Sequence, residues 1–160
     1  MIEDRNRPVA TNATSGGVNS EHVSAAYPLE STRNNRHMLG LQRTLEMSDV
    51  GVFEYNSNGK LVAANNSWFN LSGHHRIVNP DDERSFMDYV YEEDSEAVLN
   101  AWNQLCTEHK PVTFEMRWKF QESDTISAEE RALGGKWVLA ACVPLLENGM
   151  LLGISGMTTG

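Results

Sequence analysis

The sequence predicts an α+β fold: a five-stranded antiparallel sheet with short helices on one face. The first observation behind this prediction is the strict alternation of apolar and polar residues over Val112–Phe120. Because successive side chains of a strand point to opposite faces, this segment is expected to be a strand with one buried face. The second observation is a pair of apolar runs, Trp137–Leu146 and Met150–Thr158, which meet at Asn148-Gly149. This dipeptide supplies the positive φ of a hairpin turn. The apolar face of three such strands must be buried, and the helical segments that precede them can pack against it.

The N-terminal part of the chain divides into two segments. Residues 1–35 are rich in Asn, Ser, Thr and Gly and show no hydrophobic period, so we expect a disordered tail or linker. Residues 36–48 are expected to form a flanking amphipathic helix, because Met38, Leu41 and Leu45 fall on one helical face. A helix this short is marginal on its own and needs a partner surface.

Residues 49–160 are expected to form the main domain. It begins with strands at Val52–Tyr55 and Lys60–Ala64, which flank the hairpin signal Asn56-Ser57-Asn58-Gly59. Asn65 is placed to cap the short helix that follows.

Two further helical segments come before the third strand. Pro80 opens a short turn over Asp81–Tyr89, and Asp94 or Ser95 can cap the longest helix, which runs to about Thr107. After the third strand, Gln121–Gly135 is longer than a hairpin requires, and we interpret it as a solvated insertion.

The composition limits the partners and the compartment. With a net charge of −9 and a pI near 4.9, the chain lacks the positive field that nucleic acid or an anionic membrane requires, so neither is expected as a partner. No apolar run approaches the roughly 20 residues that span a bilayer, and Met1–Ala10 lacks the apolar core of a signal peptide. The two cysteines, Cys106 and Cys142, are expected to be reduced, as is typical of a cytoplasmic protein.

Several short motifs, taken in their order, resemble those of PAS domains, the sensor modules of many signalling proteins. The motifs are NGKLVAAN at residues 58–65, WFNLSG at 68–73, VYEED at 90–94, FEMR at 114–117, GKWV at 135–138 and GISGMTT at 153–159. VYEED departs from the family's usual VHPED at Tyr91 and Glu92. The Trp-rich style and the long insertion are most similar to PAS modules of fungal hybrid histidine kinases.

This resemblance implies a pocket between the helices and the sheet, and a function in signal transduction. A module of this kind detects a small apolar ligand or an interaction and relays it to an output domain such as a histidine kinase. The family normally continues into a signalling helix where this chain stops at Gly160, so we expect a piece of a longer protein. The candidate pocket residues are Phe53, Trp68, Phe86, Trp102, Phe114, Met116, Trp118, Val138, Ala140, Cys142 and Gly156. In the alternative interpretation these residues form a filled core, and the chain is a protein–protein interaction or dimerisation module without a ligand.

The fourth strand is expected to be apolar on both faces. Alternate residues from Val138 to Cys142 are expected to face the helices, which leaves Trp137, Leu139 and Val143 on the outer face. Because an exposed apolar patch usually marks an interface, we expect the flanking helix, or its copy in a second chain, to cover this face. A homodimer is then the expected assembly. The expected interface residues are Met38, Leu41, Leu45, Trp137, Leu139 and Val143.

The sequence argues against flavin and leaves the cofactor unknown. Flavin-binding light sensors related to the family carry a Cys in an NCRFL motif, and residues 74–78 of this chain, HHRIV, have none. Those sensors also hold the flavin ring with Asn and Gln side chains. The corresponding positions here are Met116 or Trp118, Val138 and Thr158, and none of these is an amide.

Haem, metal ions and catalysis also find little support. Haem-binding members place a His on the longest helix, whereas His109 falls just past its end. His74 and His75 are adjacent, so their side chains diverge, and no Cys or carboxylate lies at metal-ligand spacing around them. No phosphate loop and no Ser/His/Asp set is recognisable, so the chain itself is not expected to be an enzyme.

Overall fold

The computed structural model describes residues 34–160. The described residues divide after Gly40 into two units, the second of which is Leu41–Gly160, and each is described by itself. Residues 34–46 are helical, and this helix ends where the Ser48 hydroxyl and backbone N–H both donate to the carbonyl of Leu45, at 2.7 and 3.2 Å. The tail expected over residues 1–35 falls, apart from its last two residues, outside the described part of the chain.

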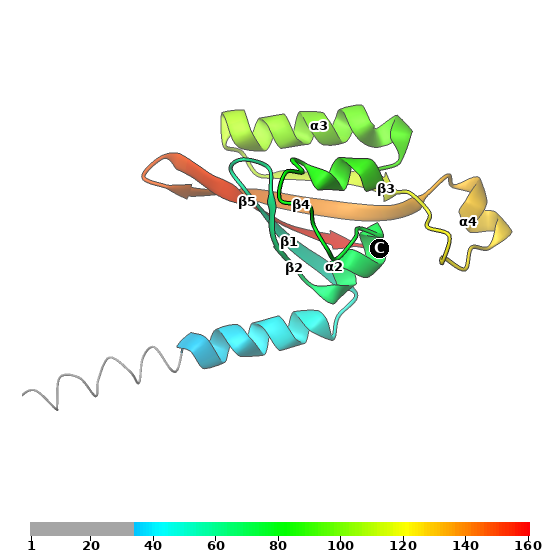
Figure 1. The fold of residues 1–160 in the computed structure, drawn as a ribbon, viewed down its shortest axis with the longest axis horizontal. Coiled ribbons are helices and arrows are strands. Elements are labelled where there is room, and N and C mark those ends of the chain that lie inside the picture. The colour runs from blue at the N-terminus through cyan, green and yellow to red at the C-terminus, as the bar shows by residue number, and fades with distance from the viewer. Residues whose placement is uncertain (1–33) are drawn as a thin grey trace, which may run out of the picture. The chain divides into compact units, whose positions relative to one another are not determined.

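The second unit contains a five-stranded antiparallel sheet with the strand order β2-β1-β5-β4-β3 (Figure 1). The strands are β1 (Val50–Asn56), β2 (Leu61–Ala64), β3 (Val112–Trp118), β4 (Lys136–Glu147) and β5 (Met150–Thr159). The predicted fold class is therefore confirmed. Each predicted strand is present, with bounds that differ by no more than two residues.

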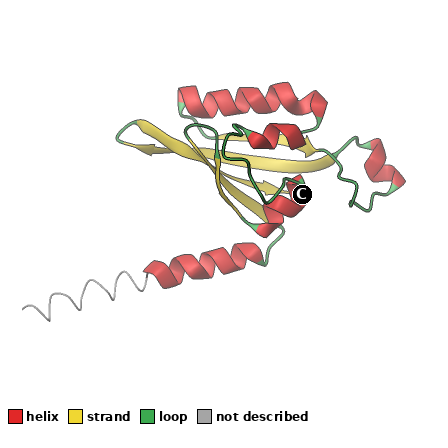
Figure 2. Cartoon of the chain, in the orientation of Figure 1, coloured by secondary structure: helices red, strands yellow, loops and turns green. Residues whose placement is uncertain are grey.

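Short helices pack on one face of this sheet (Figure 2). They are α2 (Asn66–Ser72), the 3₁₀ turns η1 (Ser85–Tyr89) and η2 (Glu92–Asp94), and α3 (Ser95–Asn103), which continues as the π-helical turn η3 (Gln104–Glu108). The short helix α4 (Ala128–Ala132) lies in the insertion between β3 and β4, and Ser127 and Glu130 form a capping box at its start.

The turns form where the sequence supplies residues that adopt positive φ. In the β1–β2 hairpin Gly59 has φ 77°, and in the β4–β5 hairpin Asn148 and Gly149 have φ 51° and 76°. Positive φ at both central residues is the geometry of a type I′ turn, which matches the twist of the flanking strands. The two hairpin signals of the sequence are thus confirmed.

Asn65 joins the first hairpin to α2. Its Oδ1 accepts from the backbone N–H of Trp68 at 3.0 Å, which caps the helix, and from that of Val52 at 2.8 Å. Its Nδ2 donates to the carbonyl of Val50 at 2.9 Å. One side chain therefore fixes the start of α2 against β1, and with it the position of Trp68.

β1 and β5, which are neighbours in the interior of the sheet, carry the two ends of the domain. They pair in antiparallel register from Val50 opposite Thr159 to Asn56 opposite Gly153. The chain therefore enters the sheet and leaves it at the same end, on neighbouring strands.

The core lies between the helices and the inner face of the sheet. The inward residues of β3 and β4 are buried, as their alternation predicts, with Met116, Trp118 and Val138 each 3% exposed. The outward residues Trp137 and Leu139 are 44% and 46% exposed. The sheet therefore has one buried face and an outer face on which apolar residues of β4 are exposed.

Candidate functional site

A small apolar cavity lies between the inner face of the sheet and the helices. Its volume is about 40 Å³, which is room for a few non-hydrogen atoms, since a single water needs about 10–15 Å³. The lining residues are Phe53, Trp68, Phe86, Val98, Ala101, Trp102, Leu105, Phe114, Met116, Trp118, Ala140, Cys142, Ile154 and Thr158. No charged side chain is among them, so the cavity suits a neutral occupant.

Small residues on the sheet keep this space open. Ala140 and Cys142 on β4 present short side chains to the cavity. Gly156 on β5 lies under the Phe53 ring, because a Cβ at this position would collide with that ring and with Cys142 Sγ. Burial raises the pKa of the Cys142 thiol to about 12, so this sulfur is a neutral wall atom and not a reactive thiolate.

Most of the predicted pocket residues are brought together. Phe53, Trp68, Phe86, Trp102, Phe114, Met116, Trp118, Ala140 and Cys142 all line the cavity. Two predicted residues do not: Val138 is buried in the core beside it, and Gly156 lies behind Phe53. That the cavity holds a ligand stays a prediction.

Five lining residues were not among the predicted ones, although the sequence pattern contains a signal for each. Val98, Ala101 and Leu105 share a helical stripe with Trp102, which was predicted. Ile154 and Thr158 alternate with Gly156 on β5 and therefore share its face.

Aromatic rings pack edge to face around Trp68, which is fully buried. The Trp68 ring lies 5.5 Å from that of Phe53 and 6.1 Å from that of Trp118, between ring centroids, and the planes of the two indoles are at 88°. Such tilted and edge-on pairs are the favoured aromatic geometry. The rings of the cavity wall therefore hold one another in position.

Three buried polar atoms of the cavity residues have no hydrogen-bond partner. They are the indole Nε1 of Trp68, the indole Nε1 of Trp118 and the hydroxyl Oγ1 of Thr158. All three side chains are at least 97% buried, and all three line the cavity. Native proteins rarely leave buried polar atoms without a hydrogen-bond partner, so the unpaired state of these three atoms calls for an explanation.

A buried chain of hydrogen bonds runs beside the cavity, from Tyr55 through Ser85 to His74. The Tyr55 and Ser85 hydroxyl oxygens are 2.9 Å apart, and Ser85 Oγ lies 2.7 Å from His74 Nε2. His74 Nδ1 lies 2.7 Å from the carbonyl oxygen of His75. Because a carbonyl only accepts, Nδ1 carries the proton, Nε2 accepts from Ser85, and Ser85 accepts from Tyr55.

Burial favours the neutral forms of the His74 imidazole and the Tyr55 hydroxyl. It lowers the pKa of His74 from its ordinary value of 6.5, more than the nearby carboxylates of Asp82 and Asp88 raise it. Burial also raises the pKa of the Tyr55 hydroxyl. The sequence pattern around His74 was interpreted only for metal binding, so this buried role was not predicted.

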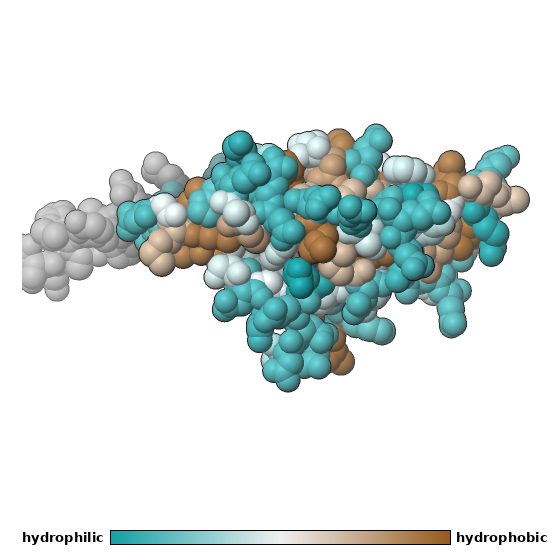
Figure 3. Space-filling view, turned by 90° about the horizontal axis from the view of Figure 1, so that it is seen from above, coloured by the Kyte–Doolittle hydropathy of each residue, from teal (hydrophilic) through white to brown (hydrophobic). Residues whose placement is uncertain are grey.

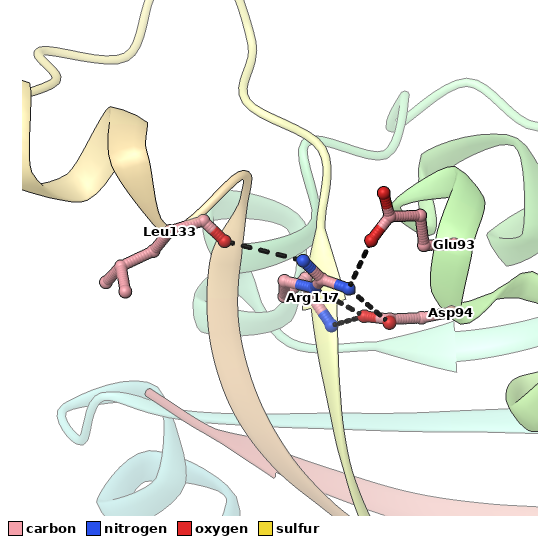
Figure 4. Close-up of polar contacts among 4 residues, drawn as sticks. All are labelled: Glu93, Asp94, Arg117 and Leu133. Carbon is pink, nitrogen blue, oxygen red and sulfur yellow. Dashed lines mark hydrogen bonds and ion pairs between the residues drawn. The ribbon is translucent and has the colours of Figure 1, made fainter.

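Arg117 fastens the edge strand β3 to the start of α3 (Figure 4). Its Nε and Nη2 donate to the two carboxylate oxygens of Asp94 at 2.9 and 2.7 Å, and its backbone N–H donates to Oδ2 at 2.8 Å. These hydrogen bonds lower the pKa of Asp94. The guanidinium also lies over the rings of Tyr91 and Trp137, at 4.2 and 4.8 Å from their centroids. These contacts of Arg117 hold β3 in place, and the inward side chains of β3 form one wall of the cavity.

The outer face of the sheet bears a second, open groove with an apolar lining. Leu45, Val52, Ala141, Val143 and Met157 are among the residues that line it. The predicted interface residues Leu45 and Val143 therefore meet in this groove, whereas Trp137 and Leu139 are not among its lining residues. Leu41 is 50% exposed, and Met38, in the first unit, is 57% exposed.

The opposite side of the second unit, over α3, differs in character (Figure 3). Hydrophilic side chains predominate in this view, with apolar patches between them. On α3, Glu96, Asn100 and Asn103 are exposed. The exposed apolar residues Leu139, Val143 and Met157 therefore lie on the outer face of the sheet, whereas these exposed residues of α3 are polar.

Two other features are absent from residues 34–160. No group of three or more His, Cys, Asp or Glu side chains in this range is placed to hold a metal ion. In the same range, no helix has the length and apolar character needed to cross a membrane.

Comparison with known proteins identifies the fold. The chain matches no protein-family model, and no curated protein matches it in sequence. It is similar in structure to the PAS domain of a protein from Colwellia psychrerythraea, with a TM-score of 0.52 and 16% identity over 76% of this chain and 94% of that one. A sensory box histidine kinase/response regulator from Burkholderia thailandensis gives a TM-score of 0.53 and 15% identity over 74% and 82%.

A third solved structure agrees with these two. It is a domain of the sensory box sensor histidine kinase/response regulator from Geobacter sulfurreducens, with a TM-score of 0.51 and 16% identity over 81% of this chain and 99% of that one. The five-stranded antiparallel sheet with short helices over its inner face is thus the fold of PAS domains. The chain has the PAS fold that its motifs indicate, while the likeness to fungal hybrid histidine kinases stays a prediction from the sequence.

Proposed function

We propose that this chain is a sensory PAS module of a cytoplasmic signalling protein. It detects a small molecule in the cavity and relays its presence to an output domain such as a histidine kinase. The observation that carries the proposal is the cavity itself, a neutral space walled by aromatic rings and small side chains. The names of the structural neighbours, which include sensory box histidine kinases, support the same function.

The size of the cavity bears on the mechanism. A space of about 40 Å³ holds only a few atoms, so a larger ligand binds by displacing wall residues. Met116 is suited to such movement, because its unbranched thioether side chain adapts to irregular spaces. A ligand that binds the opened form more tightly than the closed form shifts the population between them, and this difference in affinity is the signal. The module needs no catalytic group of its own for this purpose.

Native mass spectrometry of the gently purified protein tests the proposal. We expect a bound small molecule that is lost when Ala101, on the cavity wall, is replaced by leucine. Ala97, one turn earlier on α3 and exposed, is the matched control: Ala97→Leu should retain the molecule. A circular dichroism spectrum of each variant verifies folding. If the wild-type protein carries no bound small molecule, this result would contradict the ligand-sensing function and favour dimerisation, the second candidate function.

The outer face supports a second candidate function, dimerisation. Leu139, Val143 and Met157 are 46%, 44% and 42% exposed on one side of the sheet, which is unusual for apolar residues in a row on neighbouring strands. We propose that a second copy of this chain covers them, with the helical residues Met38, Leu41 and Leu45 in the contact. This assembly does not require a ligand.

The double variant Leu139→Lys/Val143→Lys tests this interface. Sedimentation equilibrium is expected to show a dimer for the wild type and a monomer for the variant, because two buried, unpaired ammonium groups would oppose association. Val62→Lys is the control, since Val62 is also exposed but lies on β2, away from this patch. A wild-type protein that stays monomeric at high concentration would refute dimerisation through this face.

A further inference from the structure

The unpaired polar atoms of the core belong to side chains that line one cavity. Among the described residues, the buried side-chain atoms without a partner are Trp68 Nε1, Trp118 Nε1 and Thr158 Oγ1, and each belongs to a side chain that lines the inner cavity. These side chains come from α2, β3 and β5, which are separate in the sequence. Nothing in the local structure of a single element explains why all three are unpaired.

Leaving these atoms unpaired is costly. A buried donor without an acceptor costs about 1–3 kcal/mol, whereas a carbon atom of the same shape costs nothing. The edge-to-face contact between Trp68 and Trp118 can direct an N–H toward a π face, but such contacts are second-order compared with an N–H···O bond. Phenylalanine at these positions would fill much of the same space without this penalty.

The chemistry of the wall defines the ligand that would satisfy it. The two indole groups only donate, and no cation or carboxylate lines the cavity. An anionic ligand would therefore be buried without a counter-charge, and a donor-rich ligand would find few acceptors. The rest of the wall is hydrocarbon, sulfur and aromatic ring, which suits an apolar body.

We infer that the cavity binds a small uncharged molecule with an apolar body and an acceptor oxygen, such as a ketone, aldehyde or ether, which accepts from Trp68 or Trp118. This inference rests on the proposed ligand-sensing function and specifies its ligand. The sequence predicts a small apolar ligand; the inference adds to this ligand a carbonyl or ether group.

Acetone and isobutene are suitable probes, because they have the same shape and number of non-hydrogen atoms and differ in one group, C=O against C=CH₂. Titration is followed by the indole ¹H–¹⁵N resonances, which Trp→Phe variants assign. We expect acetone to shift the indole proton of Trp68 or Trp118 downfield, as a new hydrogen bond does, and isobutene to cause no such shift. Trp137, on the outer face, is the internal reference.

Conservative variants test the assigned donors. Trp68→Phe and Trp118→Phe keep an aromatic ring and remove the N–H, so the affinity for acetone relative to isobutene should fall by about 2- to 10-fold for the residue that donates. Trp102→Phe is the matched control, because Trp102 lines the same cavity but its N–H is not among the buried unpaired atoms. If one variant fails to fold, the other and the wild-type resonances still decide the result.

The outcomes separate the inference from the proposed function. If both probes bind and the affinity ratio is the same in wild type and variants, the cavity is a ligand site but the acceptor inference is wrong. If the indole protons show contact with bound water and acetone does not move them, the donors serve water alone and the acceptor inference is wrong, while the ligand-sensing function is still decided by the native mass spectrum.

Discussion

Replacement of Trp68 by alanine is expected to destabilise the domain by about 3–5 kcal/mol, the usual cost of removing a large buried aromatic side chain. Trp68 is fully buried and contacts the rings of Phe53, Trp118 and His74. Its removal would join the existing cavity to a new one, and the rings around it cannot collapse into the space without leaving their own contacts. Because a domain of this size has a free energy of unfolding of only about 5–15 kcal/mol, the variant should be close to unfolding.

Urea denaturation measures this loss, with two comparisons. Trp137→Ala removes an indole that is 44% exposed on the outer face and should cost well under half as much. Trp68→Phe keeps most of the ring and should fall between the two. Equal losses for Trp68→Ala and Trp137→Ala would mean that the aromatic cluster does not hold the core together.

The stability of the domain is expected to fall as the pH drops below about 6.5, through the protonation of His74. Burial lowers the pKa of His74 in the folded protein, so the unfolded chain binds its proton more readily. Stability from this group is therefore complete above the ordinary pKa of 6.5 and decreases as the pH falls toward the lowered value. In the folded protein a proton on Nε2 would compete with the Ser85 hydroxyl, and one buried O–H would lose its acceptor.

His74→Gln should remove this part of the pH dependence, since a glutamine can accept from Ser85 but does not titrate. The adjacent His75 is exposed, so His75→Gln should leave the pH dependence of stability unchanged. The measurement is the difference in free energy of unfolding between wild type and each variant, from about pH 7 to pH 5. All other ionisable groups are the same in wild type and variants, so their contribution cancels in the comparison. A slope that persists in His74→Gln would assign the effect to other groups.

The fold could be predicted because its signals are local. Asn148-Gly149 determines a hairpin through the φ angles it favours, and Asn65 determines a helix start through a cap that reaches three residues ahead. Alternation placed Met116 and Trp118 on the inner face because one face of β3 is polar. The exact helix type was not predictable, because whether residues 104–108 form α or π turns depends on their packing and not on their residue types.

The site could be predicted only in its hydrophobic part. Large aromatic residues such as Trp68 are buried for reasons visible in composition. Thr158 and His74 are polar, and their burial depends on partners that lie far away in the sequence: Thr158 faces Gly51, and His74 meets Ser85. Neither contact has a sequence period, so neither was predicted. Whether the aromatic residues fill the core or leave a cavity depends on volumes summed over five strands and several helices, which no single segment encodes.

The pairing of Val50 with Thr159 has a mechanical consequence. Phe53 on β1 and Ile154 and Thr158 on β5 all line the cavity, so a ligand bound there would contact two strands that are neighbours in the sheet. Any sliding or tilting of one strand against the other would change the spacing between Val50, where the chain enters β1, and Thr159, where it leaves β5. The hydrogen bonds between β1 and β5 would thus transmit a change in the cavity to both of these ends together.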